Sequence, residues 1–316
     1  MKNTYLIFTN SVDWTADYIS SYLIKHKIGF FRFNIDMWDQ YKINVTSQTA
    51  SLSDLTGRVI DLYDESIFLL WRKPFTDLMI LDGLQISEED ATFCRRQISE
   101  FLKYVVRLLL LKNQVRLIEP YADSRLPKLL QLHIAKENFK IPNYSFDNIS
   151  PQFFMGKKII TKPLCDPSIG KKIFYTSSVD KDKLFRPFPW FLQEAILGGI
   201  DITCVYINGE CFFYQCNFKR DNKSVDWRTE INKENQSKWS PFVHKEVDAL
   251  SKGVRKFMKS VNLHYGRIDF ILRRDNFYFL ECNSNGEFGW LDGEEKTFLH
   301  DKFIAAFTST SSTVTI

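Results

Sequence analysis

Apolar runs and a helix-like stretch alternate at the start of the chain. Residues 5–9 (YLIFT) predict a buried strand, and residues 29–33 (GFFRF) predict the next one. The residues between them, 11–25, predict a helix. Because this order is that of a βαβ unit, we expect a small α/β domain with a partly parallel sheet. The turn at residues 9–13 has no G-x-G-x-x-G pattern, which argues against a dinucleotide site there.

A second group of patterns completes the first third of the chain. Residues 43–70 alternate like short antiparallel strands and lead into a strand that ends in Arg72, Lys73 and a proline. Two cations at a strand end can bind an anion, but solvated surface charges fit this pattern equally well. Ser87 then predicts the N-cap of a long helix with apolar residues at helical spacing. This helix is core or a subunit interface, and we expect it to close the first domain near residue 118.

The middle of the chain predicts shorter elements. Asn208-Gly209 lies between two alternating apolar runs, which is the strongest short-range signal for a hairpin. The expected strands cover residues 158–163, 190–196, 202–207 and 211–215, and the expected helices cover residues 123–140 and 241–261.

The strongest chemical signal lies near the C-terminus, where the apolar runs GRIDFIL and FYFLECN flank a polar turn and predict a hairpin. If the turn centres on Asp275, Asp269 lies opposite Glu281. The same register places Arg267 opposite Asn283. Alternation along both strands puts all four side chains on one face.

Two carboxylates that face each other across a strand pair repel one another and call for a compensating cation. Two carboxylates and an amide carbonyl are hard oxygen ligands that suit Mg²⁺, which also binds substrate phosphates in many sites. A surface hairpin with a solvated polar face explains the same alternation. The spacing by itself does not decide between these two interpretations.

Composition narrows the class of protein. At 316 residues the chain is long enough for two or three domains, and its net charge of +4 with no Lys/Arg block gives no reason to expect a nucleic-acid partner. The N-terminal apolar run is too short for a signal peptide, and the longest apolar run, residues 105–111, contains Arg107 and cannot cross a membrane. Six cysteines without a C-x-x-C pair predict reduced thiols and a cytoplasmic protein, and scattered histidines argue against zinc.

Taken together, the order of these features resembles the ATP-grasp superfamily of carboxylate–amine and carboxylate–alcohol ligases over essentially the whole chain. The fold class that the resemblance implies is α/β with α+β elements, with ATP held between two antiparallel sheets. It implies three domains: an N-terminal α/β domain at 1–118, a small central domain at 119–188 that covers ATP and binds a leader peptide, and a C-terminal ATP-grasp domain at 189–316.

The resemblance also implies ATP and Mg²⁺ as cofactors and a set of site residues. Two lysines would bind phosphates, a linker strand would bind adenine, and an acidic residue would bind the ribose. An R-x-D…E-x-N signature would supply the metal ligands and an arginine that stabilises the transferring phosphoryl group. The nucleotide residues are Lys128, Lys162, Gln193, Glu194, Ala195, Ile196 and Asp201; the metal ligands are Asp269, Glu281 and Asn283; the catalytic arginine is Arg267.

Within the superfamily, the chain is most similar to the maturases of graspetides, the microviridin-type and grasp-with-spasm enzymes. The residues that carry this likeness are Trp71-Arg72-Lys73-Pro74, Asp226-Trp227-Arg228 and the ending at 283–290. It implies a macrocyclase that activates Asp/Glu side chains of a ribosomal precursor peptide as acyl phosphates and joins them to Ser/Thr hydroxyls or Lys amines.

The resemblance implies a precursor peptide as partner, a homodimer, and no membrane partner. The acidic core peptide would bind in a positive groove near Arg72, Lys73, Lys219, Arg220 and Arg228. No general base stands out, and Glu287, Asp226 and His264 are the candidates.

Two other functions fit the sequence. One is an ATP-grasp ligase that acts on a small amino acid or a dipeptide. The other is a non-catalytic ATP-binding module that has kept the fold.

Overall fold

The computed structural model describes most of the chain in two compact units. Unit 1 consists of Met1–Arg125, Asn262–Tyr265 and Ser284–Ile316, and unit 2 of Leu126–Val261 and Gly266–Asn283. The three-domain division stays a prediction. The described residues are 4–64, 66–72, 86–112, 114, 126–147, 154, 157–164, 168–169, 172–173, 176–179, 189–217, 239–292 and 298–308.

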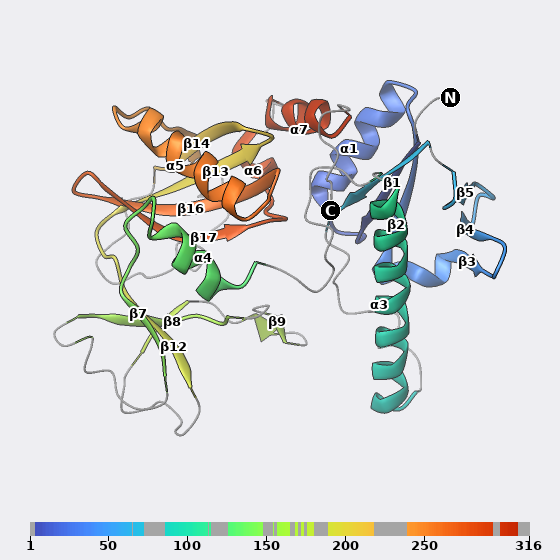
Figure 1. Ribbon diagram of the computed structural model, residues 1–316, viewed down its shortest axis with the longest axis horizontal. Helices are drawn as coiled ribbons and strands as arrows, with labels where there is room; N and C mark the ends of the chain where they lie inside the picture. The colour runs from blue at the N-terminus through green and yellow to red at the C-terminus, as the bar shows by residue number, and fades with distance from the viewer. Residues whose placement is uncertain are drawn as a thin grey trace. The chain divides into compact units, whose positions relative to one another are not determined.

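Unit 1 is built on a parallel sheet with strand order β2-β1-β6 (Figure 1). The predicted βαβ opening is confirmed, because β1 pairs in parallel with β2 after the helix α1. That helix begins at Trp14 because the Asp13 side chain accepts a hydrogen bond from the Ala16 amide at 3.2 Å. The elements here are β1 (Thr4–Thr9), α1 (Trp14–Lys25), β2 (Gly29–Asn34) and β6 (Ile67–Trp71).

Among its described residues, unit 1 also contains a 3₁₀ helix, a small antiparallel sheet and three further helices. The small sheet has the order β3-β4-β5. Ser87 caps the long helix as predicted, with its hydroxyl accepting from the Asp90 amide at 3.0 Å. The bounds of these elements of unit 1 are η1 (Ile35–Gln40), β3 (Tyr41–Val45), β4 (Ala50–Asp54), β5 (Val59–Asp61), α3 (Glu88–Leu111), α6 (Gly289–Asp292) and α7 (Phe298–Thr308).

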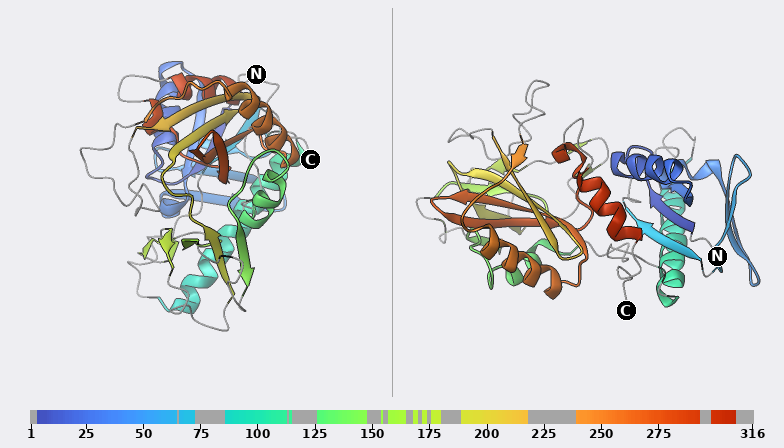
Figure 2. Two further views of the ribbon diagram at one scale, coloured as in Figure 1. Left: turned by 90° about the vertical axis from the view of Figure 1, so that its left-hand side faces the viewer. Right: turned by 90° about the horizontal axis from the view of Figure 1, so that it is seen from above.

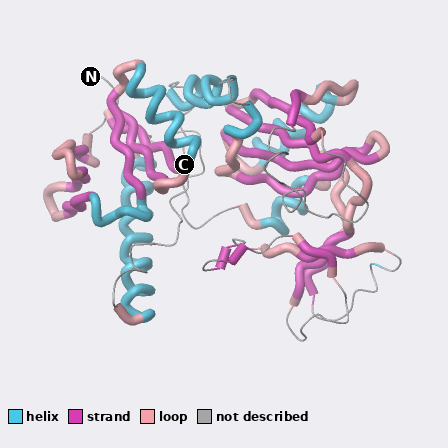
Figure 3. Tube along the Cα trace, turned by 180° about the vertical axis from the view of Figure 1, so that it is seen from behind, coloured by secondary structure: helices cyan, strands magenta, loops and turns pink. Residues whose placement is uncertain are grey.

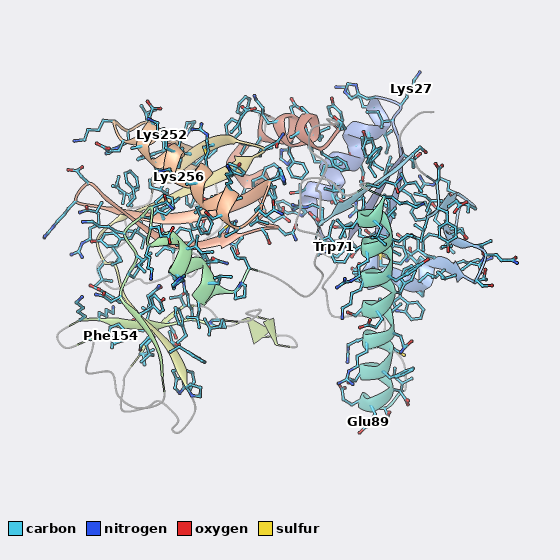
Figure 4. The ribbon with its side chains drawn as sticks, viewed as in Figure 1. Lys27, Trp71, Glu89, Phe154, Lys252 and Lys256 are labelled. Atoms are coloured by element: carbon cyan, nitrogen blue, oxygen red, sulfur yellow. The ribbon has the colours of Figure 1, made fainter. Side chains whose placement is uncertain are left out.

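Burial along α3 is uneven. Most of its buried residues, including Leu102, Val105 and Leu109, lie in its C-terminal half. Figure 4 labels Glu89 at the end of the helix that lies away from the sheet residue Trp71. The C-terminal half of α3 is therefore core, and a role as a subunit interface stays a prediction for the other half.

Arg72, the residue after β6, lies inside unit 1 with no exposed side-chain surface. Its Nε is 3.3 Å from Asp13 Oδ2, and its Nη2 is 3.2 Å from Glu287 Oε1. The guanidinium carbon lies 5.9 Å from the ring centroids of Tyr265 and Phe303. Burial by itself lowers the pKa of Arg72, but the two carboxylates raise it overall, so the side chain stays charged.

This burial corrects the expectation that Arg72 lines an open positive groove. A cation with no exposed surface is not available to a peptide in this structure, because Asp13 and Glu287 enclose and neutralise it. Glu287 also accepts a hydrogen bond from the Thr15 hydroxyl at 2.6 Å. This candidate base is thus held by two partners inside unit 1.

Tyr265 connects this buried network to the C-terminal hairpin. It is the first residue of β16, it is fully buried, and its hydroxyl donates to the carbonyl of Gly286. Its ring packs edge-on against Phe288 and Phe303. The chain on both sides of the hairpin is therefore fixed in the core of unit 1.

In its described residues, unit 2 contains two larger antiparallel sheets and a two-stranded one, with helix α5 along one face of the five-stranded sheet (Figure 2). The five-stranded order is β15-β14-β13-β16-β17, and the four-stranded order is β11-β8-β12-β7. The strands are β7 (Tyr144–Asp147), β8 (Ile159–Thr161), β9 (Ser168–Ile169), β10 (Lys172–Ile173), β11 (Ser177–Ser178), β12 (Trp190–Glu194), β13 (Ile200–Ile207), β14 (Glu210–Cys216), β15 (Trp239–Pro241), β16 (Tyr265–Arg273) and β17 (Asn276–Asn283); the helices are α4 (Lys128–Ala135) and α5 (Val247–Ser260).

Two sequence predictions for unit 2 have clear outcomes. The Asn208-Gly209 hairpin is confirmed, and both residues have the positive φ angles (43° and 96°) that such a turn requires. The helix expected from residue 241 begins only at Val247, because Pro241 pairs with Tyr214 as the last residue of β15. Along the parts of the chain that the structure describes, no helix is both long and apolar enough to cross a membrane.

We predict that Arg72→Ala lowers the free energy of unfolding by about 3–5 kcal/mol, because the fully buried Asp13 carboxylate and the partly buried Glu287 carboxylate would lose their counter-ion. Urea unfolding followed by circular dichroism measures this. Arg58→Ala is the matched control: its exposed ion pair with Asp54 predicts a loss below about 1 kcal/mol. Equal losses for the two variants would contradict a buried network.

A second prediction concerns His264, a candidate base that precedes Tyr265. Burial lowers the pKa of His264, so the folded protein binds this proton less tightly than the unfolded chain does. Above the unfolded pKa of about 6.5, His264 is neutral in both states and its full contribution to stability is present. As the pH falls, the unfolded chain takes up the proton first, and this contribution is lost as the pH falls through the lower pKa of the folded protein. His264→Gln should therefore lose less stability than the wild type between pH 7.5 and pH 5, measured by urea unfolding. Parallel pH dependences of both proteins would rule this out.

Candidate functional site

The hairpin β16–β17 places the four predicted side chains as expected. Asp269 lies opposite Glu281, and Arg267 lies opposite Asn283. The turn itself differs: Arg273 pairs with Asn276, so the turn centres between Arg274 and Asp275, which have φ angles of 47° and 60°.

A β-bulge reconciles this turn with the observed pairing. The register shifts between Asp269 and Phe270, because Phe270 pairs with Phe279 and leaves Leu280 as an additional residue in β17. Without that shift, Leu280 would lie opposite Asp269. The consecutive residues Leu280 and Glu281 both line the same cleft, which regular alternation does not allow.

A cleft lies between the two larger sheets of unit 2, whose strands Figure 3 shows in magenta. The cleft is open to solvent, and its empty space, including the part at its mouth, is about 800 Å³. Nine of the predicted site residues line it. They are Lys162, Gln193, Glu194, Ala195, Ile196, Asp201, Arg267, Asp269 and Glu281.

We call the part of the cleft formed by Asp269 and Glu281 of the β16–β17 hairpin the acidic wall, and a cation lies close to each of its two carboxylates. Asp269 Oδ2 is 3.2 Å from Arg267 Nη2, and its Oδ1 accepts from the Thr203 hydroxyl at 2.8 Å. Glu281 Oε2 is 3.5 Å from Lys128 Nζ. Two cations therefore offset the repulsion between the facing carboxylates.

The donor set of this wall fits Mg²⁺. Asp269 and Glu281 line the cleft, and Asn283 follows two residues after Glu281 on β17. Together they offer two carboxylates and an amide oxygen, all hard ligands, and leave coordination positions for water or phosphate. No group of three or more His, Cys, Asp or Glu side chains with ligand geometry occurs among the described residues. The fit depends on counting the Asn283 amide with the two carboxylates.

The two predicted phosphate-binding lysines reach backbone carbonyls near this wall. Lys128 Nζ, at the start of α4, donates to the Pro163 carbonyl at 2.8 Å. Lys162 Nζ, just after β8, donates to the carbonyl of the bulge residue Leu280 at 3.3 Å. The Lys128 ammonium group therefore lies just beyond the end of β8, and the Lys162 ammonium group lies beside β17.

The predicted adenine linker follows β12. The Glu194 carboxylate accepts from Asn143 Nδ2 at 2.7 Å and from Lys157 Nζ at 2.8 Å, so it is tied to neighbours that sequence reasoning did not identify. Gln193 is buried, and its Nε2 has no hydrogen-bond partner among the described residues. A buried donor at the cleft wall suits an acceptor atom of a ligand.

The chain from the linker into β13 packs closely on β16. A Cβ atom at Gly199 would lie 2.3 Å from Ile271 Cγ2 and 2.9 Å from the Leu272 carbonyl oxygen, so only glycine fits there. Asp201 follows, buried and lining the cleft. The predicted ribose-binding carboxylate thus lies on the same cleft as the linker.

Several predicted residues cannot be placed. Lys73, Lys219, Arg220, Arg228 and Asp226 lie outside the described residues.

Sequence reasoning missed Thr203 and Gln131. Alternation along β13 places Thr203 on the face of Asp201, which is a signal that could have identified it. Gln131 is one helical turn from Lys128 on α4, but its partner lies 151 residues away. No local pattern reveals such a contact.

Comparison with known proteins identifies the fold. No protein-family model and no curated protein matches this chain. Among solved structures, a RiPP-associated ATP-grasp ligase from Chryseobacterium gregarium, in complex with ADP and a leader and core peptide, is 21% identical over 96% of each chain, with a TM-score of 0.79.

Two further structures extend this likeness. The macrocyclase MdnC from Microcystis aeruginosa MRC, bound with precursor peptide MdnA, is 23% identical over 96% of this chain and 99% of that one, with a TM-score of 0.76. D-alanine–D-alanine ligase from Bacillus anthracis is 14% identical over 90% of this chain and 87% of that one, with a TM-score of 0.51. The chain has the ATP-grasp fold.

Proposed function

We propose that this protein is an ATP-dependent, ADP-forming ligase that cyclises a ribosomally made precursor peptide. The observation that carries the proposal is the acidic wall, in a chain folded like peptide-modifying ligases: Asp269 faces Glu281, Lys128 Nζ is 3.5 Å from Glu281, and Lys162 lines the same cleft. The substrate would be a side-chain carboxylate of Asp or Glu in the peptide.

The chemistry has two steps. A peptide carboxylate oxygen attacks the γ-phosphorus of ATP, which gives an acyl phosphate and ADP. A Ser/Thr hydroxyl or a Lys amine then attacks the acyl carbon and releases phosphate, so the peptide loses one water per ring. Because no covalent enzyme intermediate is needed, the site must mainly position the reactants and neutralise charge.

Different residues would bind the metal, contact the phosphates and stabilise the transferring phosphoryl group. Asp269, Glu281 and Asn283 would hold Mg²⁺, which offsets phosphate charge when bound. Lys128 and Lys162 would then contact phosphate oxygens in place of the backbone carbonyls that they contact here. Arg267, 3.2 Å from Asp269, would stabilise the transferring phosphoryl group.

The remaining cleft residues would hold the nucleoside. Gln193 to Ile196 would bind adenine through backbone groups and the buried Gln193 amide, and Asp201 would bind the ribose hydroxyls. The leader peptide would bind the predicted central domain, and the groove for the acidic core would be lined by Lys73, Lys219, Arg220 and Arg228.

We also propose that the protein is a cytoplasmic homodimer. The described cysteines, Cys94, Cys204, Cys211, Cys216 and Cys282, are all free thiols, which supports a reducing compartment. Sedimentation of the purified protein tests the dimer.

We predict that the protein, with ATP, Mg²⁺ and the peptide encoded beside it, removes one water per ring from that peptide. Asp269→Asn and Glu281→Gln should each slow this reaction by about 100-fold or more, because each removes one charged metal ligand. Mass spectrometry of the peptide measures both.

The matched control is Asp275→Asn, which removes a carboxylate from the exposed turn of the same hairpin and should leave the rate unchanged. An unaltered rate in Asp269→Asn would remove the metal site from the proposal. ADP release with free amino acids or dipeptides, and none with the peptide, would favour the small-molecule ligase instead.

A further inference from the structure

One buried side chain, Gln131, bonds both backbone groups of Cys282. Gln131 Nε2 donates to the Cys282 carbonyl at 3.0 Å, and the Cys282 amide donates to Gln131 Oε1 at 2.7 Å. Gln131 is 4% exposed, so water does not compete freely for these groups. The side-chain amide thus takes the place that a neighbouring strand would occupy.

This position on β17 is an edge. β17 is the last strand of its sheet, and in an antiparallel strand the N–H and C=O of one residue point to the same side. Both groups of Cys282 bond to Gln131, so they point away from β16. Near the turn the same edge is covered by Lys140, whose carbonyl accepts from the Phe279 amide at 2.8 Å.

The residues on either side of Cys282 are the proposed ligands Glu281 and Asn283. The bulge at Leu280 interrupts the ladder with β16 directly before Glu281, so the inner edge holds this segment less firmly. The Cys282 side chain is buried on the opposite face, with Sγ 3.9 Å from Met258 Sδ. Cys282 is therefore held by its side chain in the core and by its backbone at Gln131.

Gln131 also connects β17 to the start of helix α4, which carries Lys128. Its Nε2 donates to the Leu126 carbonyl at 2.7 Å, just before the start of α4. Lys128 lies one turn earlier on the same helix, with Nζ 3.5 Å from Glu281. One amide therefore holds the helix that carries the phosphate-binding lysine against the strand that carries two metal ligands.

We propose that Gln131 is a positioning residue that fixes Glu281 and Asn283, and with them Lys128, for binding Mg²⁺ with a nucleotide. This inference rests on the proposed function. Gln131 touches neither metal nor substrate and acts through the Cys282 backbone, as outer residues of metal sites commonly do.

The first test does not involve metal. Gln131→Leu removes both hydrogen bonds to Cys282 and the one to Leu126. The Cys282 amide should therefore exchange its hydrogen faster, measured by hydrogen–deuterium exchange and mass spectrometry on peptides spanning residues 276–284. Gln131→Glu keeps an oxygen acceptor for that amide and should retain more of its protection. Gln97→Leu, the same change at an exposed position of α3, should leave this segment unaltered.

The second test measures Mn²⁺, which prefers the same hard ligands as Mg²⁺, by electron paramagnetic resonance in saturating ADP. Gln131→Leu should weaken Mn²⁺ binding by about 10–100-fold, and Gln97→Leu should not. If Gln131→Leu fails to fold, Gln131→Glu should still bind Mn²⁺ more weakly than the wild type, since it lacks the donor to Cys282.

The outcomes separate this inference from the proposed function. Unchanged exchange at Cys282, or faster exchange with unchanged Mn²⁺ affinity, overturns the positioning role and leaves the ligase intact. A wild-type protein that binds no Mn²⁺ with ADP, while Asp269→Asn behaves like it, overturns the metal site itself and the role of Gln131 with it.

Discussion

The repulsion between Asp269 and Glu281 is the constraint around which unit 2 is arranged. Carboxylates opposite each other on adjacent strands destabilise a hairpin unless positive charge lies close to both. Here Arg267 comes from the same strand as Asp269, whereas Lys128 reaches Glu281 from helix α4. Packing of α4 against β17 therefore brings the second of the two compensating cations to the hairpin. Under the proposed function, these two carboxylates and two cations would exchange their present partners for a divalent metal and phosphates.

Secondary structure near the site was predictable because its signals are local. The two apolar runs around a polar turn predicted the hairpin, and Asn208-Gly209 predicted its neighbour. The predicted facing pairs were also correct, but for a different reason. The turn is shorter than the sequence pattern suggested, and the bulge at Leu280 compensates for that difference. A bulge depends on how Phe270 and Phe279 pack beneath the strands, and sequence alternation carries no record of that packing.

Contacts between distant parts of the chain were not predictable in this way. Arg72 looked like a surface cation because its partners, Asp13 and Glu287, lie 59 and 215 residues away in the sequence. Gln131 had no visible role because amide side chains on helices usually face water. Both residues became interpretable only from burial and from the atoms that they touch, which single-sequence patterns do not encode.

The bulge also has a meaning for how this hairpin is built. If Leu280 were absent, Phe279 would still pair with Phe270, and Glu281 would follow directly opposite Asp269 in a regular ladder. The facing carboxylates therefore do not need an inserted residue. What the insertion adds is one backbone carbonyl turned toward Lys162 and one apolar side chain in the cleft. The facing of the two carboxylates and the placement of Lys162 are thus separate features of one strand. Deletion of the single residue Leu280 would keep the first and remove the second.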